Sequence, residues 1–295
     1  MKTINFTELK YLSLIILSII LFSCHNQKEE NWTDLLDKDL SQWDMYLSYE
    51  MKNGYNGDIN GDTILPIGYG TNYKNIFTVI EDNNEPVLKI SGEVYGCVFT
   101  KESYRNYHLR LKFKWGDKKW EPRLDKDMDS GILYHSQGEC GIDYWRTWML
   151  SHEFQFIQSG DEGNSGDYWC IGATQMTVRA HQDSAGLVFD TNAPLVTMGV
   201  GTENGYYCAA SNSKEQPTDQ WNEAELICFE GKSLHIVNGK VTMALSGLSY
   251  KDGDIVKPLI EGKIQLQSEA AEVFYKDIQI RDITQLPEEY LKFFE

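Results

Sequence analysis

A carboxylate and an amide stand two residues apart in the segment HEFQFI, residues 152–157. In a strand, alternation places Glu153 and Gln155 on one face and the histidine and both phenylalanines on the other. The aromatic face belongs in the core, so His152 is predicted to be structural and the polar pair to face solvent. Such a pair can bind a sugar or a metal ion, and a plain polar pair on a solvated sheet is the alternative.

A second polar position ends the segment DSGILYH, residues 129–135, where alternation puts His135 on the same face as Asp129. A lone histidine is more often structural than functional, so its place in the sequence does not decide its role. Farther along the chain, Gln267 and Glu269 repeat the pairing of an amide and a carboxylate on one strand face. Glu269 could equally be a turn residue.

The elements that must position these residues are short strands. Turn signals such as Asn238-Gly239 separate the alternating segments, and only the last dozen residues suggest a helical period. Many strands, few helices and no linker predict a single all-β sandwich domain. The strand-length segments are residues 77–82, 86–92, 107–115, 152–158, 223–230, 233–239, 262–268 and 273–283.

Composition limits the class of protein. The chain has 295 residues, which fits one large all-β domain, and its 41% hydrophobic and 13% aromatic content excludes a mainly disordered chain. The 27 basic and 44 acidic residues give a formal net charge of −17. Nucleic acid and anionic lipid would repel such a chain, so neither is an expected partner.

The N-terminus carries an export signal. Two lysines precede the apolar run YLSLIILSIILF, residues 11–22, which is too short for a stable membrane anchor and ends at Ser23-Cys24. It resembles a bacterial lipoprotein signal, with residues 1–23 removed, Cys24 acylated and residues 24–30 as a tether. An ordinary secretory signal is the alternative. Either way we expect export to the cell envelope, in the outer membrane or periplasm, with the lipid as the only membrane contact.

The remaining cysteines do not form a recognisable framework. If Cys24 is acylated, five are left, and an odd number forbids a complete disulfide set. No pair has C-x-x-C spacing, so a structural zinc site has little support. We interpret these cysteines mainly as small core residues, with the partners in any disulfide not identifiable from spacing.

Several sequence blocks together resemble the 3-keto-disaccharide hydrolase domain family. The likeness implies a concanavalin-like or laminarinase-like jelly roll over residues 31–283, with sugar bound on a concave sheet face and residues 284–295 as a tail that could be helical. The blocks, in order, are WTDLLDKDLSQW (32–43), GCVFTKESYRNYHLRLKFKWG (96–116), WEPRLDKDMDSGILYH (120–135), HEFQ (152–155), WNEAEL (221–226), VNGK (237–240) and GKIQLQSEAAEVFYKDIQI (262–280).

The resemblance also implies a reaction: cleavage of 3-keto-glycosides and 3-keto-disaccharides at the bond to the aglycone. A 3-ketone acidifies the hydrogen on C2, so a positioned base can remove it and the C1 substituent then leaves. A cation or convergent donors must stabilise the enolate, and water adds back to the double bond. A non-catalytic sugar-binding surface lipoprotein is the alternative, and the oligomeric state is not indicated.

Roles for individual residues follow from the resemblance. It implies Glu153 or His135 as the base, with His135 standing where the family has an arginine. Gln155 and Gln267 would bind sugar hydroxyls, and Glu269 would be an acid or a ligand. His135, Glu153 and Glu269 together would hold one divalent cation of unspecified identity. The other candidates for substrate contact are Lys114 and Arg123, which would polarise the ketone or be plain surface charges, and Trp145, which would stack on the sugar.

Overall fold

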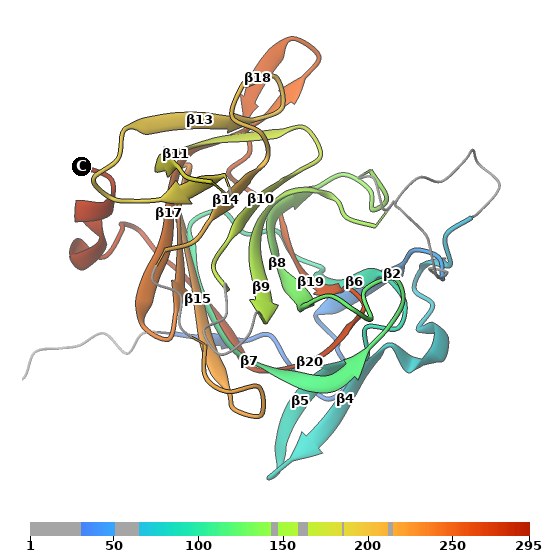
Figure 1. Cartoon of the computed structure of the whole chain (residues 1–295). Coiled ribbons are helices and arrows are strands. Elements are labelled where there is room, and N and C mark those ends of the chain that lie inside the picture. The colour runs from blue at the N-terminus through green and yellow to red at the C-terminus, as the bar shows by residue number, and fades with distance from the viewer. Residues whose placement is uncertain (1–30, 51–64, 143–146, 159–164, 185, 212–214) are drawn as a thin grey trace, which may run out of the picture. The chain divides into compact units, whose positions relative to one another are not determined.

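Two β-sheets contain nearly all of the regular structure between Thr33 and Glu295 (Figure 1). The structure is a computed structural model, and the expected signal peptide, Cys24 and the tether lie outside the residues it describes, as does Trp145. The described residues are 31–50, 65–142, 147–158, 165–184, 186–211 and 215–295.

The first sheet is built on two long antiparallel strands, β7 (Tyr107–Lys119) and β20 (Ala271–Asp282). Beyond β20 lie β1 and the β4–β5 hairpin, and beyond β7 the order continues β15, β16, β17, β11 and β13, with β18 also on β17. Their bounds are β1 Thr33–Asp34, β4 Phe77–Asp82, β5 Glu85–Ile90, β11 Thr174–Gln182, β13 Leu195–Gly199, β15 Asn222–Phe229, β16 Lys232–Val237, β17 Lys240–Asp252 and β18 Ile255–Pro258.

The second sheet has the order β3, β2, β6, β19, β8, β9, β10, β14 and β12. Strand β12 also pairs with β11, which joins the two sheets. The short 3₁₀ helices η1 (Tyr73–Asn75) and η2 (Glu288–Phe293) complete the elements. The strand bounds are β2 Trp43–Leu47, β3 Gly68–Tyr69, β6 Gly96–Thr100, β8 Met128–Gln137, β9 Leu150–Gln158, β10 Tyr168–Ile171, β12 Leu187–Phe189, β14 Tyr207–Ala209 and β19 Lys263–Ser268.

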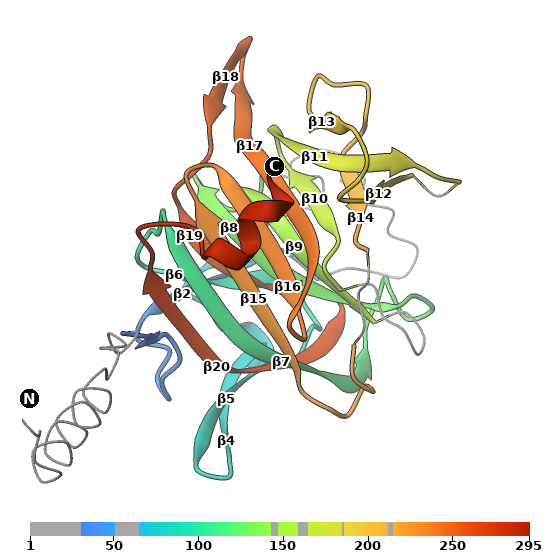
Figure 2. The same ribbon diagram turned by 90° about the vertical axis from the view of Figure 1, so that its left-hand side faces the viewer.

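The core fills the space between the two sheets, which Figure 2 shows one behind the other. The ring of Phe113 on β7 stacks on Phe156 of β9 at 4.2 Å between centroids, and Phe154 stacks on His235 of β16 at 4.1 Å. These are the inward residues of the predicted alternation. The structure confirms the predicted all-β jelly-roll sandwich.

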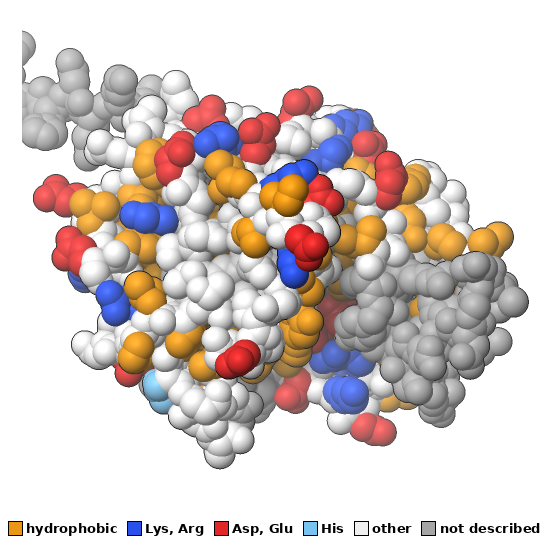
Figure 3. Space-filling view, turned by 90° about the horizontal axis from the view of Figure 1, so that it is seen from above, with side chains coloured by type: hydrophobic (Ala, Val, Ile, Leu, Met, Phe, Trp, Pro, Cys, Tyr) orange, Lys and Arg blue, Asp and Glu red, His pale blue; other side chains and the backbone are white. Residues whose placement is uncertain are grey.

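The surface mixes both charges. On the face shown in Figure 3, acidic and basic side chains are interspersed with apolar ones, so the net negative charge is not gathered there into one patch. Within the part of the chain that the structure describes, no helix has the length and apolar character needed to cross a membrane.

Candidate functional site

The predicted polar residues meet on the face of the second sheet that points away from the core. In the register, Glu153 of β9 lies opposite Leu133 of β8, and Gln155 lies opposite Gly131. A bridge pairs Asp129 with Glu269 at the other side of β8. We call this surface the site face; its polar members are Asp129, Glu153, Gln155, Gln267 and Glu269.

The site face is buried, although the sequence predicted solvent-facing residues. Glu153 is 4% exposed and Gln155 7% exposed, and strand β8 is buried on both faces over nearly its whole length. A carboxylate that leaves water loses solvation, so it requires hydrogen-bond or charged partners from the protein. The site face supplies these from its own side chains.

Gln267 holds the carboxylate of Glu153. Its amide nitrogen donates a hydrogen bond of 3.1 Å to Glu153 Oε1, whereas its amide oxygen is buried with no hydrogen-bond partner among the described residues. The space that Gln267 occupies depends on Gly131, because a Cβ at that position would lie 2.7 Å from the Gln267 oxygen and 2.7 Å from the Phe154 carbonyl. The glycine of DSGILYH therefore lets the two polar side chains close over β8.

Arg123 joins the carboxylates at the other end of the site face. It lies between β7 and β8, and one guanidinium nitrogen is 2.6 Å from Asp129 Oδ2 while another is 3.8 Å from Glu269 Oε1. Gln155 also donates to Asp129, at 2.9 Å. Burial raises the pKa of Asp129, and the Arg123 charge and the Gln155 hydrogen bond oppose that rise. The Arg123 guanidinium therefore compensates the charge of two buried carboxylates.

Strand β10 extends this surface with Trp169, and two residues near it, Asp167 and Tyr207, had no predicted role. Trp169 lies opposite Glu153 and donates its indole N–H to Gln155 Oε1 at 2.8 Å, yet its side chain is 37% exposed. Its ring centroid is 4.7 Å from that of Tyr207, whose hydroxyl donates to Asp167. The alternation of Asp167 and Trp169 about the buried Tyr168 is the sequence signal that could have placed both on this face.

Asp167 is a buried acid with a shifted pKa. Burial raises its pKa to about 6, although the backbone N–H of Ala210 and the hydroxyl of Tyr207 both hydrogen-bond its carboxylate and oppose the rise. The group therefore changes charge near neutral pH at the edge of the site face.

The prediction that His135 shares the face of Asp129 is wrong. The register shifts between Tyr134 and Gln137, and His135 has a φ of 51°, so a bulge turns its side chain toward the core. Its ring lies 5.9 Å from that of Tyr107 on the opposite sheet, and Nδ1–H donates to the Leu259 carbonyl at 3.1 Å. Strict alternation cannot anticipate this inserted residue.

The expected metal ligands consequently do not fit a cation. His135 is on the core side of β8, Glu153 is bonded by Gln267, and Glu269 lies beside the Arg123 guanidinium. Among the described residues, no group of three or more His, Cys, Asp or Glu side chains has a metal-binding arrangement.

The prediction that Lys114 polarises a substrate ketone is also wrong on position. Phe113 points into the core, so Lys114 points out of the opposite sheet, with its ammonium 5.1 Å from the centroid of the Trp221 ring. The whole sandwich separates it from Glu153. Of the two predicted cations, only Arg123 reaches the site face.

Three histidines meet in the core beneath the site face: His135 of β8, His152 of β9 and His235 of β16 in the opposite sheet. The Nδ1 of His152 hydrogen-bonds the Tyr168 hydroxyl at 2.6 Å, as expected for a structural residue. His235 donates from Nδ1 to the Gly166 carbonyl and accepts from Tyr134 at Nε2. Burial lowers the pKa of His135 to about 4, that of His235 to about 3, and that of His152 well below its usual value.

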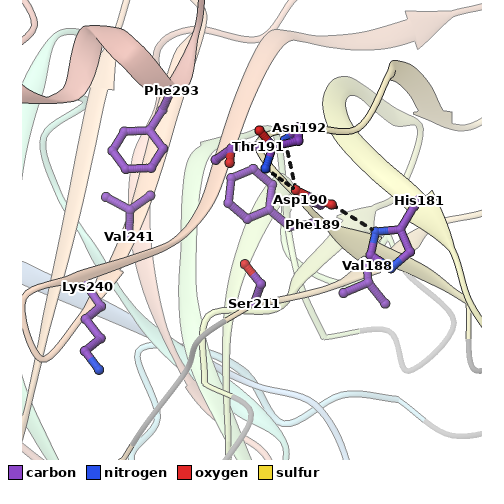
Figure 4. Close-up of a pocket in the computed structure, with 10 residues that line it drawn as sticks. All are labelled: His181, Val188, Phe189, Asp190, Thr191, Asn192, Ser211, Lys240, Val241 and Phe293. Atoms are coloured by element: carbon purple, nitrogen blue, oxygen red, sulfur yellow. Dashed lines mark hydrogen bonds and ion pairs between the residues drawn. The ribbon is translucent and has the colours of Figure 1, made fainter.

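A separate groove of about 710 Å³ lies beside β11, β12 and the β16–β17 turn (Figure 4). His181 Nδ1 is 3.6 Å from Asp190 Oδ2 there, and Phe293 closes one end of the groove. None of the predicted site residues lines this groove, so it is not the surface that the sequence indicates.

Comparisons with known proteins place the chain in a family. The model of the 3-keto-alpha-glucoside-1,2-lyase-like domain matches residues 31–281, whereas no curated protein matches the chain. Similar solved structures include a putative glycosyl hydrolase from Parabacteroides distasonis, with 16% identity, 86% of this chain and 100% of that chain covered, and a TM-score of 0.45. Carbohydrate-binding module CBM66 from Bacillus subtilis is also similar, with 7% identity, 70% of this chain and 92% of that chain covered, and a TM-score of 0.39.

A third similar structure is LamAcat from Zobellia galactanivorans, with 8% identity, 86% of this chain and 94% of that chain covered, and a TM-score of 0.39. The family match covers the whole sandwich and confirms the resemblance drawn from the sequence blocks. The chain belongs to the 3-keto-alpha-glucoside-1,2-lyase-like domain family and is a carbohydrate-active protein.

Proposed function

We propose that the protein cleaves 3-keto-glycosides by elimination, with Glu153 as the base. The observation that carries this proposal is the arrangement of Glu153, which is a buried carboxylate held by one amide and set on a face with a guanidinium-linked acid pair. Family membership supports the substrate class. A carboxylate is a sufficient base for this substrate, because the ketone at C3 makes the C2 hydrogen much more acidic than it is in an ordinary glycoside.

In the proposed reaction, Glu153 takes the proton from C2 and the C–H electron pair forms the enolate of the 3-ketone. The enolate then returns its electrons, a C1–C2 double bond forms, and the C1–oxygen bond to the aglycone breaks. Glu269 enters the cycle protonated and gives its proton to the departing oxygen. Water then adds to the double bond: its hydroxyl goes to C1 and its other proton returns to Glu269, while Glu153 gives the proton it took back to C2. The sum is an apparent hydrolysis that leaves both carboxyl groups as they began.

We assign the stabilisation of the negative charge on the enolate to Arg123. Its guanidinium contacts Asp129 and Glu269, so it lies where negative charge from an enolate oxygen can be shared without a large rearrangement. Gln155 and Gln267 are assigned to sugar hydroxyls, and the exposed ring of Trp169 to one face of the sugar. Buried donors act more strongly than they would in water.

A non-catalytic sugar-binding protein is the second candidate. The observation that favours it is the pair of adjoining rings, Trp169 and Tyr207, beside hydrogen-bonding amides. Such a platform suffices to bind a sugar, since stacking and hydroxyl contacts need no acid or base.

The two candidates separate in one experiment. The purified full chain is mixed with a 3-keto-glucoside that carries a chromogenic aglycone, and release is followed for wild type, Glu153→Gln and the distant control Lys114→Gln. We expect Glu153→Gln to lose about 10²–10⁴-fold in turnover with sugar binding retained, and Lys114→Gln to match wild type. Sugar binding by wild type without release would establish the binding protein instead.

Export and lipid anchoring at Cys24 belong to this proposal. The apolar run before Ser23-Cys24 and the acidic composition support a protein held at the membrane by lipid alone. Labelling cells with a fatty acid tests it: wild type should carry label in the membrane fraction, and Cys24→Ala should carry none. Label on the Cys24→Ala chain would contradict the assignment.

A further inference from the structure

Two cysteines from distant parts of the chain meet beside the site face. Cys97 belongs to β6 and lies opposite Gln267 in the register, whereas Cys140 follows the end of β8. Their sulfur atoms are 4.0 Å apart. A disulfide bond is about 2.0 Å long, so oxidation requires the two sulfurs to approach by roughly 2 Å.

Hydrogen bonds already fix the backbone on both sides of this pair. The N–H of Cys140 donates to the Tyr69 hydroxyl at 2.7 Å. The thiol of Cys97 donates to Gln265 Oε1 at 3.2 Å, and the same oxygen accepts the N–H of Met149 at 3.4 Å. The beginning and the end of the connection between β8 and β9 are therefore both held near β6, which keeps the two sulfurs close.

We propose that Cys97 and Cys140 form a disulfide by exchange with a small-molecule or protein disulfide. Cys140 is the partly exposed member of the pair, so its thiolate attacks one sulfur of the oxidant and releases one thiol. The thiolate of Cys97 then attacks the Cys140 sulfur of this mixed disulfide and releases the second thiol. Two protein thiols are oxidised, the oxidant is reduced to two thiols, and the two protein protons leave on them.

The other described cysteines are internal controls. Cys170, Cys208 and Cys228 are buried in the main core cluster. Burial raises the pKa of Cys170 to about 11 and that of Cys208 to about 12, and it raises that of Cys228 as well. Among the described cysteines only Cys140 is partly exposed, so it is the thiol that an oxidant reaches first, and Cys97 is the cysteine whose sulfur lies beside it.

The cross-link would act on the connection that carries Trp148. This tryptophan stacks on Tyr95 at 6.5 Å between centroids and lies in the small apolar cluster with Cys97 and Leu133, on the site side of the sheet. Closing a loop between residues 97 and 140 restricts the unfolded chain. We therefore expect the disulfide to stabilise this side of the sandwich without changing the polar residues of the site face.

The test uses the full chain purified in detergent and incubated with oxidised glutathione or with reductant. Free thiols are then alkylated, and peptides are mapped by mass spectrometry. We expect a linked peptide pair containing Cys97 and Cys140, and a thermal midpoint about 5–10 °C above that of the reduced chain. The Cys140→Ser chain should show neither the linked pair nor the shift.

Two results would overturn the proposal. One is alkylation of both Cys97 and Cys140 in oxidised chain that circular dichroism shows to be folded. The other is a folded Cys140→Ser chain that keeps the oxidation-dependent shift in midpoint. Since Cys140 is not a core residue, its serine variant is expected to fold; Cys140→Ala provides a second readout that does not add a hydroxyl.

Discussion

Strand β9 carries buried polar groups on both of its faces, and the two rows are built on different principles. On the core side, His152 lies among aromatic rings, and burial lowers its pKa and that of each neighbouring histidine. On the site side, Glu153 and Gln155 belong to a chain of amides and carboxylates that ends at Arg123. Burial is nearly equal for the two rows, so burial alone does not identify a reactive surface.

The difference lies in charge compensation. The core histidines can give up their charge, since a neutral imidazole packs against aromatic rings and keeps one or two hydrogen bonds. The site carboxylates are instead kept beside donors and one guanidinium. This arrangement costs stability and is useful where charge develops during a reaction.

Replacement of Arg123 should have the largest effect on both stability and turnover. Arg123→Gln leaves Asp129 and Glu269 without their shared cation, so the free energy of unfolding should fall by about 3–5 kcal/mol. Turnover of the 3-keto-glucoside should fall by about 10²–10³-fold. Urea unfolding and aglycone release measure the two effects.

Arg110→Gln is the matched control, because Arg110 lies on the opposite sheet and contacts Gln279. The free energy of unfolding of the Arg110→Gln chain should fall by less than about 1 kcal/mol, and its turnover should equal that of wild type. Chelating agents should leave wild-type turnover unchanged, because the proposal assigns the stabilising positive charge to Arg123 and not to a metal ion. An Arg123→Gln chain with normal turnover would refute this role.

Acidification should destabilise the core that holds the three histidines. His235 has a pKa of about 3 when folded and about 6.5 when unfolded, so below pH 6.5 the unfolded chain binds the extra proton. Stability is therefore fully present above pH 6.5 and is lost as the pH falls toward 3. For His235→Gln, the loss between pH 6.5 and 4 should be smaller than in wild type by about 1.4 kcal/mol per pH unit.

Urea unfolding of both chains at several pH values measures this slope. Subtracting the two curves cancels the carboxylates that both chains share. The glutamine variant should also be about 1–3 kcal/mol less stable at pH 7, because it loses part of the hydrogen bonding to Gly166 and Tyr134. Identical slopes would mean that His235 is not held neutral.

The smallest effect is expected at the edge of the site face. Trp169→Phe removes the hydrogen bond to Gln155 and part of the exposed ring, so KM should rise about three- to tenfold while kcat changes little. Steady-state kinetics separate the two constants. The matched Trp221→Phe variant, on the far sheet beside Lys114, should leave both constants unchanged.

Sequence patterns predicted the positions that depend on regular alternation. Glu153 and Gln155 lie on the strand face that alternation predicts, because no bulge interrupts β9 between them. His135 does not, because a bulge reverses its side and nothing in the hydrophobic pattern marks the extra residue. Parity alone could have placed Lys114 outside, since Phe113 and Trp115 are the inward residues of that strand.

Long-range contacts were beyond the reach of these patterns. The burial of β8 on both faces depends on segments far away in the chain, including β19, which pairs with β8 and carries Gln267. The approach of Cys97 to Cys140 likewise results from the order of β6, β19 and β8 in the sheet. Local sequence specifies which faces are polar, but sheet order decides which of them meet.

If Glu153 removes the C2 proton, breaking of the C2–H bond should show a kinetic isotope effect. Turnover is compared for 3-keto-glucosides that carry hydrogen or deuterium at C2. We expect a slower reaction of the deuterated substrate, together with exchange of solvent deuterium into C2 of the recovered product. Equal rates with no solvent deuterium at C2 would mean that the C2–H bond stays intact, which would contradict elimination and favour direct displacement at C1.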